Sequence, residues 1–140
     1  MPLWTVHHPT GTYTPAQKRD FATDITGIYT GIGLPAFYVV VAFTEHEPSS
    51  LLIGGEPASQ AVRIVIDHIA VHQDGVDGMR RTAHRIDTVI ARHTRDRGLY
   101  SEFHVDETPR ELWVVDGHEP PPFGSSAEAA WARQNRPSTY

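Results

Sequence analysis

The feature that most constrains the fold of this chain is a pattern of strand, helix and strand that occurs twice. The first copy covers residues 3–8, 14–31 and 36–43, and the second covers residues 62–71, 79–90 and 99–106. The two copies lie about 60 residues apart and leave their last strands through similar polar segments. Right-handed crossovers place both helices on one face of a shared sheet. The repeat therefore predicts an α+β fold, in which duplicated β-α-β units at about residues 2–50 and 61–110 form a four-stranded sheet with two helices on one face.

The two helices carry the clearest local signals. Thr14 suits the N-cap, Pro15 suits the first helical position, and Gln17 completes a capping box. Apolar residues recur at helical spacing, as Phe21, Ile25, Ile28 and Ile32 in the first helix and Met79, Ala83, Ile86 and Ile90 in the second. Each stripe predicts a helix that packs one face against the sheet. The other sheet face needs cover, and we expect a second subunit to supply it.

The strands and turns outside the helices are less regular. The valine-rich run at 36–43 indicates a strand covered on both faces. The apolar piece at 51–57 contains a glycine pair and predicts a small hairpin or a loop. Residues 112–115 are followed by Asp116 and Gly117, which predicts a short edge strand entering a tight turn.

The C-terminal segment differs in composition from the rest of the chain. We assign residues 1–118 to one domain and residues 119–140 to a tail with a helical turn at 126–133. Trp131 and Tyr140 are large aromatic side chains, which solvated tails rarely carry. We therefore expect the tail to pack on a neighbouring subunit.

Composition excludes several classes of function. The 140 residues suffice for one domain with a sizeable core, and the absence of cysteine excludes disulfides and thiol catalysis. A net charge of −5 argues against nucleic acid as the main partner. No run of about 18 apolar residues is present to span a membrane. No signal peptide is visible, so we expect a cytoplasmic protein.

The start of the chain suggests a catalytic group. Pro2 follows the initiator methionine and runs directly into an alternating strand. If Met1 is removed, Pro2 becomes a secondary amine, and a free α-amino group titrates near ~8 in model peptides. Burial lowers that pKa toward neutrality, where a general base works best. Inside the chain the same nitrogen is an amide and can accept no proton.

With Pro2 in front of a duplicated unit, the chain resembles the tautomerase superfamily, whose members use an amino-terminal proline. Residues 41–45 and 52–59 are similar to the end of the 4-oxalocrotonate tautomerase subunit. The length, the helix start at 13–15 and the segment around Pro109 resemble the cis-3-chloroacrylic acid dehalogenase branch. The resemblance covers about residues 2–117. It implies a homotrimer without a cofactor, with each Pro2 at the floor of a pocket near a subunit boundary.

Beyond Pro2, the dehalogenase pattern is only partly present. Tyr29 stands where those enzymes place a histidine late in the first helix, and His104 stands where they place a tyrosine in the fourth strand. Their water-activating glutamate corresponds to Val115, or to Asp116 if one residue is skipped. A water-adding enzyme needs a base for water, whereas tautomerisation needs a proton shuttle and a group that holds the enolate oxygen. The departures favour tautomerisation, with Pro2, Tyr29, His104 and Asp116 as candidate catalytic residues.

The groups that would bind a substrate carboxylate must also differ from those of the dehalogenases. Their two arginines after the third strand correspond here to Val71 and Asp74. Arg63 in the third strand and Arg110 beside Pro109 are the alternative cations, and His72 lies where it could polarise a carbonyl. We therefore name Arg63, His72 and Arg110 as candidate substrate-binding residues.

Nine histidines raise the question of a metal site. His68 and His72 are four residues apart, but in a strand that spacing separates them by roughly 13 Å, too far to share one ion. We expect neither a metal nor another cofactor.

These observations predict a cofactor-free tautomerase or isomerase acting on a small enol, keto or unsaturated carboxylic acid. Two alternatives stay open. The same scaffold could hydrate or dehalogenate a haloacrylate-type acid, and halide release would identify that reaction. The chain could also be a non-catalytic trimeric domain that binds a ligand or partner, in which case Met1 can stay attached without consequence.

Overall fold

The computed structural model describes residues 1–69 and 72–140. Its strands are β1 (Leu3–Pro9), β2 (Val40–His46), β3 (Leu52–Ile53), β4 (Glu56–Pro57), β5 (Ala61–His68) and β6 (Tyr100–Glu107). Its α-helices are α1 (Pro15–Thr30), α2 (Gly75–Ile90) and α3 (Ser126–Gln134). Single turns of 3-10 helix are η1 (Ala36–Tyr38), η2 (Ala91–His93), η3 (Arg95–Arg97) and η4 (Arg110–Leu112).

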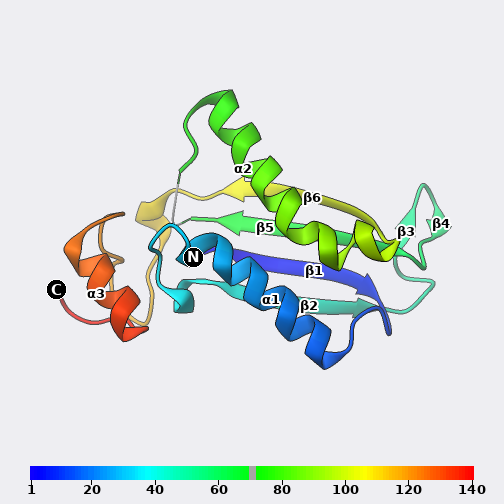
Figure 1. The fold of residues 1–140 in the computed structure, drawn as a ribbon, viewed down its shortest axis with the longest axis horizontal. Helices are drawn as coiled ribbons and strands as arrows, with labels where there is room; N and C mark the ends of the chain where they lie inside the picture. Colours follow the sequence, from blue (N-terminus) through cyan, green and yellow to red (C-terminus); the bar gives the residue numbers. More distant parts are fainter. Residues whose placement is uncertain (70–71) are drawn as a thin grey trace.

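The main sheet has the strand order β2-β1-β5-β6. β1 pairs parallel with β2, β5 pairs parallel with β6, and β1 and β5 join the two pairs in antiparallel fashion. Figure 1 shows α1 and α2 lying across the same face of this sheet, with α3 and the N-terminus near one end and the β3–β4 hairpin at the other. The predicted α+β fold with its duplicated β-α-β units is confirmed, and so is the small hairpin.

The core forms between the sheet and the two long helices. Alternate residues of β1 and β5 face the helices, and apolar stripes of α1 and α2 meet them; the fully buried members are Trp4, Val6, Phe21, Ile25, Ile64, Ile66, Ile86 and Ile90. Burial of each such side chain contributes roughly 1.5–3 kcal/mol. The capping box begins α1 as predicted, since the Gln17 N–H donates to Thr14 Oγ1 (3.2 Å) and the Thr14 N–H donates to Gln17 Oε1 (2.9 Å). Ile32 lies beyond the end of α1 and is exposed, because Gly31 follows the last helical residue.

The prediction of one strand over residues 36–43, covered on both faces, was wrong. η1 takes the first three residues, and β2 begins at Val40 and forms an edge of the sheet. Val40 is 38% exposed. The apolar run has another cause: the ring of Tyr38 is fully buried against Trp113, with centroids 4.8 Å apart, outside the sheet.

Two other segments differ from their predicted structures. No strand forms over 112–115; η4 precedes Trp113, and a single bridge joins Val115 to His118 across the predicted tight turn, with Asp116 at φ 49°. The third strand, predicted to reach Val71, ends at His68, and Val71 lies outside the described residues.

The C-terminal tail packs against its own chain. Trp131 of α3 is fully buried, its ring lies 6.0 Å from Phe37 and 6.3 Å from Tyr38, and its Nε1–H donates to the Ser138 carbonyl (2.8 Å). We expected a neighbouring subunit to cover this side chain, but the aromatic residues of η1 already provide an apolar surface beside it. None of the helices in the described part of the chain has both the length and the apolar character needed to cross a membrane.

Candidate active site

Pro2 lies at the end of the sheet, immediately before β1. Its ring is buried, and its carbonyl accepts a hydrogen bond from the Val40 N–H (3.0 Å). The next residue, Leu3, is paired with Val40 on one side and with Asp67 on the other. Pro2 is therefore fixed between the start of β2 and the end of β5 rather than on a free terminus.

Met1 precedes Pro2 and is itself partly buried against the core. Burial, and secondly the Arg110 guanidinium, lower the pKa of the Met1 amine from 8.0 to about 4. An ammonium group is disfavoured there because it would lose water and face a like charge. The start of β1 is thus an environment that disfavours the charged form of an amine.

Arg110 lies in η4, after β6 has ended. Its guanidinium lies over the Trp113 ring, 5.7 Å from the centroid, and donates a hydrogen bond to the Pro121 carbonyl of the tail. It lines a cavity of about 570 Å³ whose wall is made of Ile69, His72, Thr108, Pro109, Arg110, Glu111 and Phe123. Because Arg110 also acts on the Met1 amine, this cavity lies beside the N-terminus, and it brings together two predicted substrate-binding residues, Arg110 and His72.

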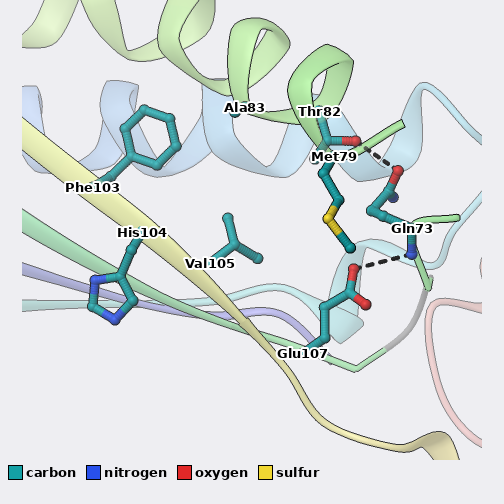
Figure 2. Close-up of a pocket in the computed structure, with 8 residues that line it drawn as sticks. All are labelled: Gln73, Met79, Thr82, Ala83, Phe103, His104, Val105 and Glu107. Atoms are coloured by element: carbon teal, nitrogen blue, oxygen red, sulfur yellow. Dashed lines mark hydrogen bonds between the residues drawn. The ribbon is translucent and has the colours of Figure 1, made fainter. Parts of the chain in front are cut away.

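Glu107, the last residue of β6, contacts His72 and Gln73, which precede α2. Its carboxylate is 2.9 Å from His72 Nδ1 and accepts a hydrogen bond from the Gln73 N–H (3.0 Å). Figure 2 shows that Gln73 is also held by Thr82 of α2, whose hydroxyl donates to Gln73 Oε1 (2.7 Å). Beside these residues lies a second cavity, of about 490 Å³. It is lined chiefly by apolar groups of α2 and β6, including Met79.

Tyr29 lies on the helix side of the sheet, inside the core. It is buried, its hydroxyl accepts a hydrogen bond from Trp4 Nε1 (2.9 Å), and burial raises its pKa to about 12. Its ring lies 5.5 Å from the ring of His68. Tyr29 therefore contacts the N-terminal region through the packing of its ring on His68.

His68, the last residue of β5, was not among the predicted site residues. The side chain is 4% exposed, and within residues 1–69 and 72–140 neither ring nitrogen has a hydrogen-bond partner. Burial lowers its pKa; among nearby charges, Glu107 raises the pKa and the N-terminal amine lowers it. The signal in the sequence was its position on the buried face at the end of the third strand, which we considered only for metal binding.

Arg63, His104 and Asp116 are not brought to this site within one chain. Arg63 Nη2 lies 2.6 Å from His104 Nδ1, and His104 Nε2 lies 3.1 Å from Asp106. These side chains lie on the sheet face opposite the helices; in Figure 2 His104 lies on the side of β6 away from Phe103. Asp116 is exposed in the turn after η4. The described residues contain no group of three or more His, Cys, Asp or Glu side chains arranged to hold a metal ion.

Comparison with known proteins identifies the family. The family profile described as "Putative oxalocrotonate tautomerase enzyme" matches residues 1–136. RhCC from Rhodococcus jostii RHA1 is 35% identical, with 99% of each chain covered and a TM-score of 0.95. A "probable enzyme" from the thermophilic fungus Aspergillus fumigatus is 38% identical over 100% of this chain and 98% of its own, with a TM-score of 0.93. A search of curated protein sequences found no match.

More distant structures share the fold. A member of the cis-3-chloroacrylic acid dehalogenase family is 16% identical over 95% of this chain and 97% of its own, with a TM-score of 0.74. A fused 4-OT asymmetric trimer is 18% identical over 84% and 94%, with a TM-score of 0.64. With its family profile over nearly the whole length and two full-length relatives above 30% identity, the chain belongs to the oxalocrotonate tautomerase-like family of the tautomerase superfamily.

Proposed function

We propose that this protein is a cofactor-free tautomerase whose proton shuttle is the secondary amine of Pro2, exposed when Met1 is removed. The observation that carries the proposal is the environment at the start of β1, where burial and Arg110 depress the pKa of an amine. Pro2 is buried one residue further in, so the same influences act on its nitrogen. A neutral amine at physiological pH can act as a general base.

Removal of Met1 supplies both the amine and the space for a substrate. The Met1 side chain packs against the core beside Pro2, and that volume opens when Met1 is cleaved. Arg110 adjoins this volume and the cavity of about 570 Å³, and it suits a carboxylate because a guanidinium can bind it through two hydrogen bonds. His72, at the wall of the same cavity, is the second polar group for the acid.

The reaction then needs no external group. Pro2 takes a proton from the carbon beside the carbonyl, and the C–H electron pair forms a C=C bond while the carbonyl pair moves onto oxygen. The prolinium then returns the proton either to the enolate oxygen, which gives the enol, or to another carbon of a conjugated system, in which case the carbonyl re-forms; the enol is converted to the ketone by the reverse steps. Arg110 holds the carboxylate throughout, which fixes the reacting carbon near the Pro2 nitrogen.

We propose further that the protein works as a homotrimer. In the described part of the chain, no element covers the sheet face opposite the helices, and this face includes the exposed residues Val40 and Ala42. The distant fold relative described as a fused 4-OT trimer supports this assembly. The open sheet faces would then meet at the centre of the trimer, with the N-termini near the subunit boundaries.

Intact mass and enzyme kinetics test the proposal together. The purified protein should lack the mass of one methionine, and it should tautomerise phenylpyruvate or a 2-hydroxydienoate. Pro2→Ala keeps an amino-terminal amine in a more flexible residue, and we expect kcat to fall by about 100-fold, the size typical of general-base removal. Full activity of Pro2→Ala, or Met1 retained on an active protein, would refute the proposal. Halide release from a 3-haloacrylate would assign the reaction to hydration.

A further inference from the structure

His68 carries two buried ring nitrogens that have no hydrogen-bond partner among the described residues. Buried polar atoms in folded proteins are nearly always hydrogen-bonded, so an imidazole with both nitrogens unpaired requires an explanation. Its ring is held in place by the Tyr29 ring, 5.5 Å away, whose hydroxyl is already engaged by Trp4. The side chain is thus fixed in position while its polar atoms are unused.

The sheet register places His68 next to Pro2. Leu3 is paired with Asp67 in the antiparallel ladder, so the preceding residue, Pro2, lies opposite the following one, His68. The parallel ladder then pairs His68 with Glu107. Pro2 and His68 share the helix-facing side with the buried residues of their strands, and the result is a row of Pro2, His68 and Glu107 across the end of the sheet.

The charges around His68 agree with this placement. The N-terminal amine and the Glu107 carboxylate are the charged groups that act on the imidazole. The amine that acts on the His68 ring belongs to Met1, so the ring lies near the volume that opens when Met1 is cleaved. A substrate in that volume would contact the Pro2 nitrogen and the His68 ring at the same time.

We propose that His68 is a second catalytic residue, whose imidazole N–H donates a hydrogen bond to the carbonyl oxygen of a 2-oxo or enol acid while Pro2 moves the proton. This assignment rests on the proposed function. The enolate oxygen carries negative charge, so it accepts the His68 hydrogen bond more strongly than the neutral carbonyl oxygen does. No proton leaves the imidazole; Pro2 takes one proton and returns the same one, so the step is balanced without a co-reactant.

Paired substitutions separate this role from packing. His68→Phe keeps a ring against Tyr29 and removes the N–H, and we expect kcat to fall by about 100-fold, as for the loss of one oxyanion donor, with KM changed less than about threefold. His68→Gln restores an N–H donor and should recover at least tenfold of that loss. His8→Phe is the matched control, because His8 is also fully buried on the helix side and lies among aromatic rings. Its kcat should stay within about twofold of wild type.

A measurement on the unmodified sequence covers the case in which His68→Phe fails to fold. In processed protein labelled with ¹⁵N-histidine, oxalate serves as a planar mimic of a 2-oxo acid enolate. We expect the His68 ring nitrogens to shift on titration and those of His8 to stay unchanged. Unshifted His68 signals with oxalate bound, or equal kcat in the His68→Phe and His8→Phe variants, would overturn the assignment. If Pro2→Ala kept full activity while oxalate still shifted the His68 ring nitrogens, the proposed function would be refuted and His68 would be a ligand-binding residue only.

Discussion

Pro2 and His68 are buried at the end of the sheet, while Glu128 is buried in α3 of the tail, 2% exposed, with no hydrogen-bond partner for its Oε1 atom among the described residues. The Gly124 N–H donates to its other oxygen, Oε2 (2.8 Å). Burial raises the pKa of Glu128, and the Gly124 hydrogen bond and Arg110 lower it in part. Because the pKa of Glu128 is raised on balance, the folded state disfavours the ionised carboxylate.

Glu128→Gln should therefore stabilise the protein at neutral pH. A raised pKa in the folded state means that the ionised carboxylate destabilises folding above that pKa, and that the penalty vanishes below the unfolded value. Glutamine keeps an oxygen for Gly124 and carries no charge, so we expect a gain of about 1 kcal/mol in the free energy of unfolding at pH 7.

Urea unfolding at a series of pH values measures this effect. The difference between Glu128→Gln and wild type should shrink as the pH falls and vanish well below 4.5, where the carboxyl is protonated in both the folded and the unfolded state. A difference that is constant with pH, or a loss of stability at pH 7, would contradict the account.

The elements differ in how far local sequence determines them. α1 was predicted almost to the residue because Thr14 and Gln17 carry a complete N-terminal signal. The run at 36–43 was misread because its valines and aromatic residues serve two purposes, an edge strand and a surface for the tail. His68 was missed because its neighbours come from β1 and β6, and no local pattern states which strands are paired.

The α1 cap can be tested at a single side chain. Thr14→Ala removes the hydroxyl that accepts from Gln17, and we expect a loss of about 1 kcal/mol in the free energy of unfolding. Thr23→Ala is the control within the same helix, because Thr23 is exposed and its hydroxyl bonds only the Arg19 carbonyl. Chemical denaturation of the three proteins compares them; equal stabilities of Thr14→Ala and Thr23→Ala would show that the capping box is not stabilising.

At the scale of the whole molecule, the open sheet face is the main feature that one chain does not explain. Thr5, Ala42, Val65 and His104 form one row across it. Repeated β-α-β units predicted this face from the sequence, because right-handed crossovers leave one side of the sheet bare. Arg63 and His104, which we predicted at the site, lie on this face, since alternate residues of a strand point to opposite sides.

Ala42→Arg should dissociate the proposed trimer. Ala42 is exposed on the open face, and three added guanidinium groups would meet near the centre of the assembly, where like charges are costly. Light scattering after gel filtration should give three chain masses for wild type and one for Ala42→Arg. Thr23→Arg places the same charge on the outer surface of α1 and should stay trimeric. A monomeric wild type, or a trimeric Ala42→Arg variant, would contradict the proposed assembly.

The proposed chemistry depends on one nitrogen atom, which a ¹⁵N NMR titration of Pro2 observes directly in protein labelled with ¹⁵N-proline. We expect Met1 to be absent and the Pro2 nitrogen to titrate as an amine, with a pKa below the value of about 8 for a free α-amino group. An amide signal at Pro2 that does not titrate, or an amine pKa at or above that value, would contradict the proposed chemistry.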